Sequence, residues 1–344
     1  MKPLRVLVLC HPQLLPPATL EGYSEKEINV WKTEYDVITT LQESGHEVRA
    51  IGVQFELQPI RDAIVNWKPD IVFNLLDEFH GETLFCQNVA AFLELMRIPY
   101  TGCNSRGMVL AQGKDLSKKL LKYHRVPVPD FAVFPIGRKV KRPPKLDFPL
   151  IVKSLTEDAS LGISQASVVD SDEKLEERVR FIHERIGTAA IAEQYIHGRE
   201  IYVGVIGNAD RYTVFPVWEV EFSKLAPGQL PIATERAKHD PVYQDKRGVL
   251  QGPADDLPQS LVTRIRSIVR RVCQTLELDG YARIDFRLAE DGTPYFIEAN
   301  PNPEIASNEE FAQAALHDGV EYGELLDRIL MLGIRRAGAE AEAA

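Results

Sequence analysis

Two carboxylates and an amide, carried by two short apolar runs, are the side chains whose types and spacing first suggest chemistry. The runs are Ala282–Leu288 and Tyr295–Ala299, and the link between them contains an Asp-Gly pair, which is typical of a β-hairpin. Asp285 interrupts the first run, Glu298 the second, and Asn300 follows two residues later. Residues i and i+2 of a strand face the same side, so Glu298 and Asn300 project together and the hairpin can bring Asp285 beside them. Such oxygen ligands suit Mg²⁺ that bridges nucleotide phosphates.

A basic residue accompanies this acidic set. Arg283 lies two positions before Asp285, on the same face of the strand, and could neutralise a phosphate or a developing oxyanion. The alternative is an ordinary exposed hairpin, because short motifs of this kind often arise by chance. Here the acids interrupt runs that look buried, and buried charges are rare unless they are paired or metal-bound.

Composition limits the classes to which the chain can belong. Its 344 residues are enough for two or three domains, and the formal net charge of −10 argues against nucleic acid as a partner. An apolar run of about 18 residues is absent, so no membrane span is expected. The cysteines are scattered without metal-ligand spacing, which favours reduced thiols and a cytoplasmic location. They are Cys10, Cys86, Cys103 and Cys273.

The first third of the chain alternates predicted strands and helices, which predicts a doubly wound parallel sheet of the α/β class. We expect this domain to cover residues 1–104. The predicted strands are Leu4–Cys10, His46–Val53, Asp70–Leu75 and Ile98–Thr101, and the predicted helices are Glu25–Ser44, Ile60–Trp67 and Thr83–Met96.

The rest of the chain predicts two α+β domains, over 105–191 and 192–335, followed by a flexible tail over 336–344. In the second domain we expect helices Gly113–His124 and Asp172–Ile186 and strands Asp130–Pro135, Leu150–Lys153 and Ala189–Gln194. In the third we expect strands Glu200–Ile206 and Thr213–Val220, a polar loop Ser223–Pro253, helix Gln259–Leu276, the hairpin and helix Tyr322–Leu332.

Four features of the second and third domains point to nucleotide phosphates. Lys114 lies in a lysine-rich helix, and Lys153 ends an apolar strand, where a cation can meet a phosphate. Small residues in the loop 155–162 let backbone N–H groups approach phosphates. Glu193 and Glu200 flank a strand end, where carboxylates can take ribose hydroxyls. A solvated lysine or an exposed glutamate is the alternative for each charged residue.

Taken together, these lysines, the acidic segment and the hairpin resemble the ATP-grasp carboxylate–amine ligases, most closely the D-alanine–D-alanine ligases. The resemblance covers nearly the whole chain and implies the ATP-grasp fold with an N-terminal doubly wound domain. It implies that Asp285, Glu298 and Asn300 hold two Mg²⁺ ions, for which Mn²⁺ can substitute, and that Arg283, Lys238 and His80 are catalytic. The nucleotide-binding residues that it implies are Lys114, Lys153, Ser160, Glu193, Tyr195, Ile196 and Glu200.

The chain departs from the family where the substrates bind. Ala159 replaces the first serine of the phosphate loop, and Glu27 is only a loose candidate for binding a donor amino group. Glu304 follows the metal asparagine in place of a glycine, and Glu309 stands where the family has a serine for the acceptor carboxylate.

The resemblance therefore implies an ATP-dependent ligase that forms an amide bond through an acyl phosphate, and the departures from the family predict an acceptor other than D-alanine. A kinase of the same fold, which phosphorylates a hydroxyl group, is the alternative. A dinucleotide oxidoreductase is disfavoured because no Gly-x-Gly-x-x-Gly follows Leu4–Cys10. We expect small-molecule carboxylate and amine substrates, no nucleic-acid or membrane partner, and a possible homodimer.

Overall fold

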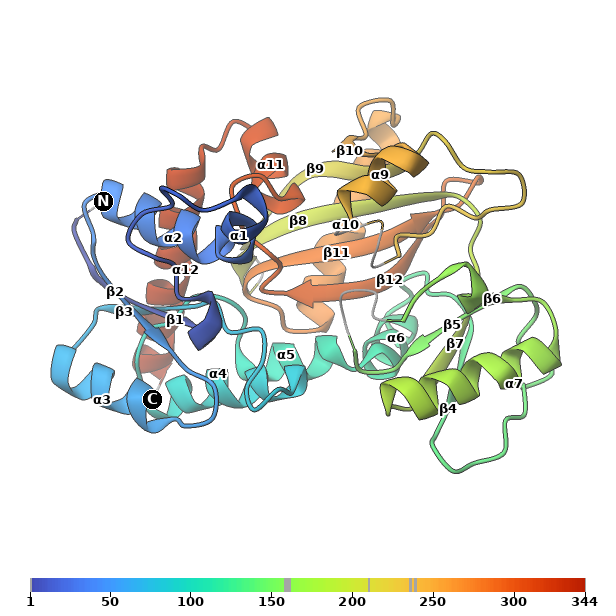
Figure 1. The fold of residues 1–344 in the computed structure, drawn as a ribbon, viewed down its shortest axis with the longest axis horizontal. Coiled ribbons are helices and arrows are strands. Elements are labelled where there is room, and N and C mark those ends of the chain that lie inside the picture. The colour runs from blue at the N-terminus through green and yellow to red at the C-terminus, as the bar shows by residue number, and fades with distance from the viewer. Residues whose placement is uncertain (1, 158–161, 210, 235–236, 238–239, 344) are drawn as a thin grey trace.

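The computed structural model describes residues 2–343 except 158–161, 210, 235–236 and 238–239. The predicted site residues Ser160 and Lys238 lie outside the described residues. Figure 1 shows three sheets, and the C-terminal sheet lies between the N-terminal unit and the small central unit. The mixed α/β and α+β class expected from the sequence is confirmed.

The N-terminal unit is a parallel sheet in the order β2-β1-β3. The apolar run of β1 is buried on both faces: Leu7 and Leu9 join one core cluster, and Val6 and Val8 join the other. The predicted fourth strand is only a bridge between Tyr100 and Val72. The elements are β1 Arg5–Cys10, α1 Glu25–Val30, α2 Lys32–Glu43, β2 Glu47–Gly52, α3 Gln58–Trp67, β3 Ile71–Asn74 and α4 Cys86–Leu95, with 3₁₀ turns at Pro12–Leu14 and Thr83–Phe85.

Between the N-terminal and central sheets the chain forms two helices, of which the sequence predicted only the second. The central sheet is antiparallel, in the order β4-β7-β5-β6. The elements are α5 Ser105–Gln112, α6 Lys114–Tyr123, β4 Phe131–Phe134, β5 Leu150–Ser154, β6 Val168–Val169, α7 Asp172–Phe181 and β7 Ala190–Gln194, with a 3₁₀ turn at Gln165–Ser167 and a π turn at Ile182–Ile186.

The C-terminal sheet is antiparallel, in the order β10-β9-β8-β11-β12, and ends in the predicted hairpin. The stretch expected as a polar loop over Ser223–Pro253 contains a short helix and an edge strand. The elements are β8 Arg199–Asn208, β9 Arg211–Phe222, α9 Pro241–Arg247, β10 Val249–Pro253, α10 Gln259–Thr275, β11 Gly280–Leu288, β12 Pro294–Pro301, α11 Glu310–His317 and α12 Tyr322–Ala343.

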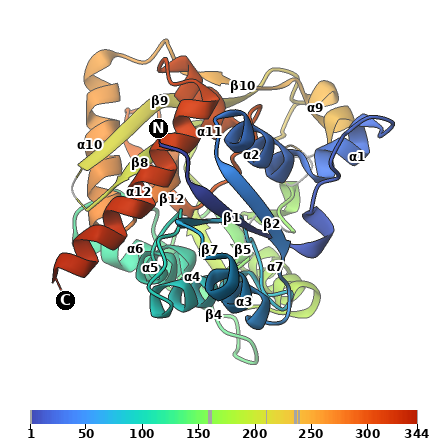
Figure 2. The same cartoon turned by 90° about the vertical axis from the view of Figure 1, so that its left-hand side faces the viewer.

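Helix α12 ties the C-terminal unit to the N-terminal one. It contacts α2 and β3 as well as β8 and β11, and Figure 2 shows it crossing beside β1 and β2. Where the sequence predicts a flexible tail from residue 336, the helix instead continues to Ala343. Arg336 is buried because its guanidinium donates to the carbonyls of Tyr100 and Gly102 and pairs with Asp279 at 3.1 Å. In the part of the chain described, no helix is long and apolar enough to cross a membrane.

Candidate active site

The hairpin brings the predicted carboxylates and amide together. Asp285 lies directly opposite Glu298, and Arg283 lies opposite Asn300. Asn300 donates through Nδ2 to Asp285 at 3.0 Å, which leaves its Oδ1 as an oxygen ligand. A register shift follows Asp285, and bulges of this kind are common beside active sites.

Arg283 is fixed by two carboxylates. Its Nε and Nη2 donate to Asp285 at 2.8 and 3.0 Å, and its Nη1 donates to Glu310 at 2.5 Å. The guanidinium also lies 4.8 Å from the centre of the Tyr202 ring. Held this way, the guanidinium has further N–H groups with which to bind an anion.

A cavity of about 90 Å³ lies between the central and C-terminal sheets. All the predicted nucleotide-binding residues that the structure describes line it, together with Asp285 and Glu298. They are Lys114, Lys153, Glu193, Tyr195, Ile196 and Glu200. The predicted residues come from separate segments of the chain and thus lie around one cavity.

Lys118, which the sequence analysis missed, is the most deeply buried cation beside this cavity. Its Nζ lies 3.2 Å from Glu193 Oε1, and Lys153 Nζ reaches the same oxygen at 3.2 Å. Burial lowers the pKa of Lys118 to about 8, which the nearby Glu193 carboxylate opposes. Burial raises the pKa of Glu193, but Lys118 and Lys153 outweigh this and hold it below its ordinary value. Glu193 therefore neutralises these lysines. In the sequence, the spacing of four residues between Lys114 and Lys118 was the one sign that both side chains lie on the same face of the helix.

The other nucleotide residues are held by polar contacts. Lys114 Nζ donates to the carbonyl of Glu157 at 2.7 Å and lies 4.0 Å from Glu298 Oε2. Glu200 accepts from the Tyr202 hydroxyl at 2.8 Å and from Arg287 at 3.2 Å. Arg287, which the sequence analysis also did not identify, is buried.

A second cavity, of about 580 Å³, lies between the N-terminal unit and the hairpin. It shares Glu157 and Glu298 with the nucleotide cavity, so the two cavities meet there. Its lining is strongly acidic, and Arg283 is the one basic residue among the described residues that line it. The acidic residues are Glu34, Asp77, Glu157, Glu298, Glu304, Glu309 and Glu310.

The crowding of these carboxyl groups changes their acidity. Burial, followed by the nearby Asp77 and Glu304 charges, raises the pKa of Glu34 to about 7. The surrounding protein and the Glu304 charge also raise the pKa of Asp77 to about 6, although the Asp77 side chain is exposed at the open cavity, and burial and Glu304 raise the pKa of Glu309 to about 8. At neutral pH the cavity therefore holds partly protonated carboxyl groups that repel one another.

Two predicted residues do not reach either cavity. His80 is exposed, with φ at 60°, and its ring packs at the edges of Phe55 and Phe79. The Glu27 carboxylate accepts from the backbone N–H and hydroxyl of Ser24 at 2.8 and 2.6 Å, as part of the capping box of α1. In their place the structure brings Asp77, which follows β3, and Glu34, on α2, to the second cavity.

The hairpin ligands fit Mg²⁺ by their chemistry. Among the described residues, no three His, Cys, Asp or Glu side chains are grouped so as to hold a metal ion. A set of two carboxylates and the Asn300 amide oxygen therefore needs water or phosphate oxygens to complete it. Mg²⁺ bound to nucleotides is coordinated in this way.

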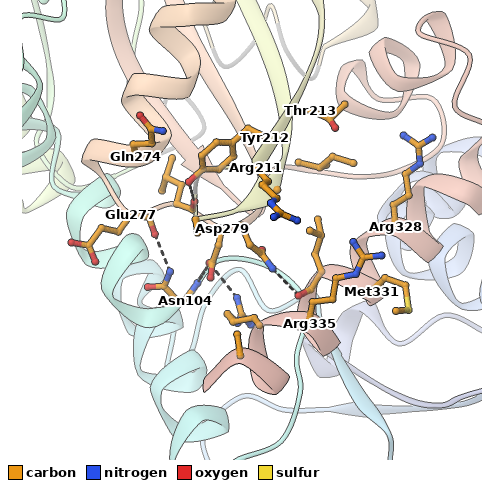
Figure 3. Close-up of a pocket in the computed structure, with 18 of the residues that line it drawn as sticks. Asn104, Arg211, Tyr212, Thr213, Gln274, Glu277, Asp279, Arg328, Met331 and Arg335 are labelled. Carbon is orange, nitrogen blue, oxygen red and sulfur yellow. Dashed lines mark hydrogen bonds and ion pairs between the residues drawn. The ribbon is translucent and has the colours of Figure 1, made fainter. Parts of the chain in front are cut away.

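A third cavity, of about 1420 Å³, lies away from these residues, along α12 and the turn between β8 and β9. Figure 3 shows Arg211, Arg328 and Arg335 around it and Asn104 at its floor, where its backbone donates to Asp279 at 2.7 Å. None of the predicted site residues lines it, so its size does not make it the catalytic site.

The arrangement of the three sheets is that of the ATP-grasp fold. The fold matches a crystal structure of D-alanine–D-alanine ligase from Bacillus anthracis complexed with ATP, with a TM-score of 0.73 and 23% identity over 98% of this chain and 99% of that one. The family model "D-ala D-ala ligase C-terminus" matches residues 120–331. The chain therefore belongs to the D-alanine–D-alanine ligase family and is an ATP-dependent C–N ligase.

Curated relatives agree with this assignment. A D-alanine–D-alanine ligase from Desulfotalea psychrophila is 30% identical over 78% of this chain and 79% of its own length. The uncharacterized protein y4sG from Sinorhizobium fredii is 31% identical over 87% of both chains.

Proposed function

We propose that the enzyme joins a carboxylate donor to a cationic or hydroxyl-bearing acceptor, such as an amine without a free carboxylate or a basic amino acid. One observation carries this proposal: Glu304 and Glu309 line the cavity that meets the nucleotide cavity at Glu157 and Glu298. An acceptor carboxylate in that cavity would face ionisable carboxyl groups, whereas an amine would be attracted.

ATP would bind at the cavity between the central and C-terminal sheets, with its phosphates near Lys114 and Lys153. Because Glu193 neutralises one of the two charges on Lys118 and Lys153, these three side chains together keep one positive charge that could face a phosphate. Glu200, fixed by Tyr202 and Arg287, would bind the ribose hydroxyls. Asp285, Glu298 and Asn300 would hold Mg²⁺, which spreads the charge of the phosphoryl group in transfer.

The reaction has two steps in the second cavity. A donor carboxylate oxygen attacks the γ-phosphorus, the bond to the β-phosphate oxygen breaks, and an acyl phosphate and ADP form. The neutral acceptor amine then attacks the acyl carbon, loses a proton, and phosphate leaves with the electron pair of the broken bond. Arg283, fixed by Asp285 and Glu310, is placed to stabilise the oxyanion of the tetrahedral intermediate.

The acceptor amine must lose a proton before or during attack. Glu309 interacts with Arg283 and Glu310, and burial with Glu304 raises its pKa to about 8. A carboxylate with that pKa accepts a proton from an ammonium group more readily than an ordinary glutamate does. In its ionised form Glu309 can therefore take the proton of the acceptor.

Three expectations stay predictions: a cytoplasmic location, a homodimer, and a γ-phosphate contact from Lys238. The four cysteines are buried and form no disulfide among the described residues, as expected where thiols stay reduced. The kinase alternative is not favoured by the family to which the chain belongs.

The experiment is an array of carboxylic acids and amines incubated with enzyme, ATP and Mg²⁺, in which ADP is quantified and product mass is determined. We expect an amide product, with basic amines or amino acid amides preferred over D-alanine. A phosphorylated hydroxyl product without an amide would overturn the ligase reaction, and a preference for acceptors with a free carboxylate would overturn the acceptor class.

A further inference from the structure

Glu34 is an acid for which the fold supplies no counter-charge. It lies on α2, is only 4% exposed and lines the second cavity. In the described part of the chain it makes no ion pair, and its carboxyl group bonds only to its own backbone N–H. Its helical neighbour Lys32 is engaged elsewhere, because it pairs with Asp36 at 2.6 Å. Burying a carboxyl group without a partner is costly, so a partner from outside the chain is expected.

Tyr281 is a second buried polar group that lines the same cavity. It lies on β11, is 2% exposed, and its hydroxyl makes no hydrogen bond to the described residues. Burial and the nearby Asp77 raise its pKa, so the hydroxyl stays protonated and can donate or accept a hydrogen bond. Buried tyrosine hydroxyls usually have a partner, and here the cavity is where one can bind.

Asp77 completes the set from a third element, the segment after β3. No described residue forms a salt bridge with it. Glu34, Asp77 and Tyr281 thus come from an N-terminal helix, an N-terminal strand end and the C-terminal sheet, and they meet at one wall of the cavity.

Among the described residues, the lining of the cavity supplies no basic side chain to pair with Glu34 or Asp77. Arg283 is the one basic residue among the described residues of its lining, and Asp285 and Glu310 already hold it. Glu309, the proposed partner of the reacting amine, interacts with Arg283 and Glu310, and Glu304 is a neighbour of Glu309 as well as of Glu34 and Asp77. The acidic lining therefore extends beyond Glu309 to Glu34 and Asp77, where a second cation can bind.

We infer that Glu34, Asp77 and Tyr281 form a cation subsite that holds a second, non-reacting ammonium or guanidinium group of the acceptor. The inference deepens the proposed function and rests on it, because it places the reacting amine at Glu309. The acceptor class is then a diamine or another amine with a second basic group. Glu34 and Asp77 select it by charge, and Tyr281 accepts a hydrogen bond from it.

The test measures binding, so that it does not depend on turnover. The full-length protein is loaded with Mg²⁺ and a non-hydrolysable ATP analogue at about pH 8, where carboxyl groups with these pKa values are largely ionised. It is titrated calorimetrically with α,ω-diaminoalkanes of three to six carbons and with alkylamines of matched length. Glu34→Gln, Asp77→Asn and Tyr281→Phe are compared with the control Glu82→Gln, an exposed acid outside both cavities.

We expect at least one diamine to bind about tenfold or more tightly than its matched monoamine. Glu34→Gln and Asp77→Asn should each remove that preference, Tyr281→Phe should reduce it a few-fold, and Glu82→Gln should keep it. Unchanged affinity for the ATP analogue shows that each variant is folded. Equal binding of diamines and monoamines, no binding of either, or a preference that survives in Glu34→Gln and Asp77→Asn overturns the subsite.

Failure of the subsite can be told apart from failure of the proposed function. If an amide product forms with monoamines while the titration shows no preference for diamines, only the subsite is wrong. If no amide forms while diamines bind through Glu34 and Asp77, the subsite stands and the proposed reaction is wrong.

Discussion

Lys118 lies 3.2 Å from the carboxylate of Glu193, and both side chains are closed off from solvent. Lys153, on strand β5 next to the strand of Glu193, lies 3.2 Å from the same carboxylate oxygen. The pairing places one negative charge between two positive ones, so these three side chains together keep a positive balance without leaving two ammonium groups in direct repulsion. Glu193 therefore has a structural role as well as lining the cavity in which we propose that ATP binds.

We predict that Glu193→Gln destabilises the fold. It removes the counter-charge of two buried ammonium groups, and breaking a buried ion pair typically costs about 3–5 kcal/mol of unfolding free energy. Urea denaturation followed by circular dichroism measures the loss. The control Glu221→Gln, an exposed acid on β9, should change stability by less than about 0.5 kcal/mol. Wild-type stability in Glu193→Gln would mean that Lys118 is not held as a cation.

The metal assignment predicts a loss of turnover without a loss of fold. Glu298→Gln and Asp285→Asn should each lower the rate of ADP formation by more than about 100-fold, because even second-shell changes cost 10–100-fold. Glu290→Gln, an exposed acid at the turn of the same hairpin, should keep the rate. Circular dichroism and an Mg²⁺ titration separate metal binding from folding. Near-normal ADP formation in either site variant would remove that residue from the metal site.

The raised pKa of Glu34 predicts that the stability of the folded protein depends on pH. Its pKa is raised to about 7 in the folded protein, so the folded state binds this proton more tightly than the unfolded state does. The resulting stabilisation is fully present below the ordinary glutamate pKa, about 4.5, and is lost as pH rises through about 7. Glu34→Gln cannot ionise, so relative to the wild type it should gain stability over this range, by at most about 3 kcal/mol. Urea denaturation from acid to mildly alkaline pH, with Glu82→Gln as control, measures the difference. If the unfolding free energies of the wild type and Glu34→Gln changed in parallel with pH, the prediction would be contradicted.

The parts of the site that lie on regular strands could be predicted from the sequence. Asp285, Glu298 and Asn300 belong to one hairpin, whose register follows from its turn and its apolar pattern. Lys153 ends an apolar strand, so its position beside a cavity also follows from local pattern.

The parts that depend on packing between distant segments could not be predicted. Lys118 is buried because α6 presents it to the hairpin, where it donates to the Ile297 carbonyl; in sequence it is one lysine among several on an amphipathic helix. Glu34 and Asp77 look like surface acids until the N-terminal unit meets the hairpin across the second cavity. The resemblance to the family implied that His80 is catalytic, but the turn after β3 places Asp77 at the cavity. Arg336 is ordered by carbonyls more than 200 residues away along the chain.

The acceptor is where this chain differs most from relatives named D-alanine–D-alanine ligases, and we predict that D-alanine is a poor acceptor for it. A D-alanine acceptor brings a carboxylate, which needs hydrogen-bond donors. The cavity instead offers Glu304 and Glu309, and the one basic side chain among its described lining residues, Arg283, already binds Asp285 and Glu310. Like charges held close together repel, and a repulsion of about 3 kcal/mol corresponds to a loss of about 100-fold in kcat/KM.

Incubation of the enzyme with ATP, Mg²⁺ and D-alanine alone, with mass detection of D-alanyl-D-alanine, measures this directly. The matched comparison replaces D-alanine by D-alanine amide, which keeps the amine and the methyl group but has no carboxylate. If charge is the cause, the amide should be the better acceptor, and Glu309→Gln should narrow the gap between the two by removing one of the opposing charges. Formation of D-alanyl-D-alanine at rates on the order of 1–10³ per second, as in a working enzyme, would refute the prediction.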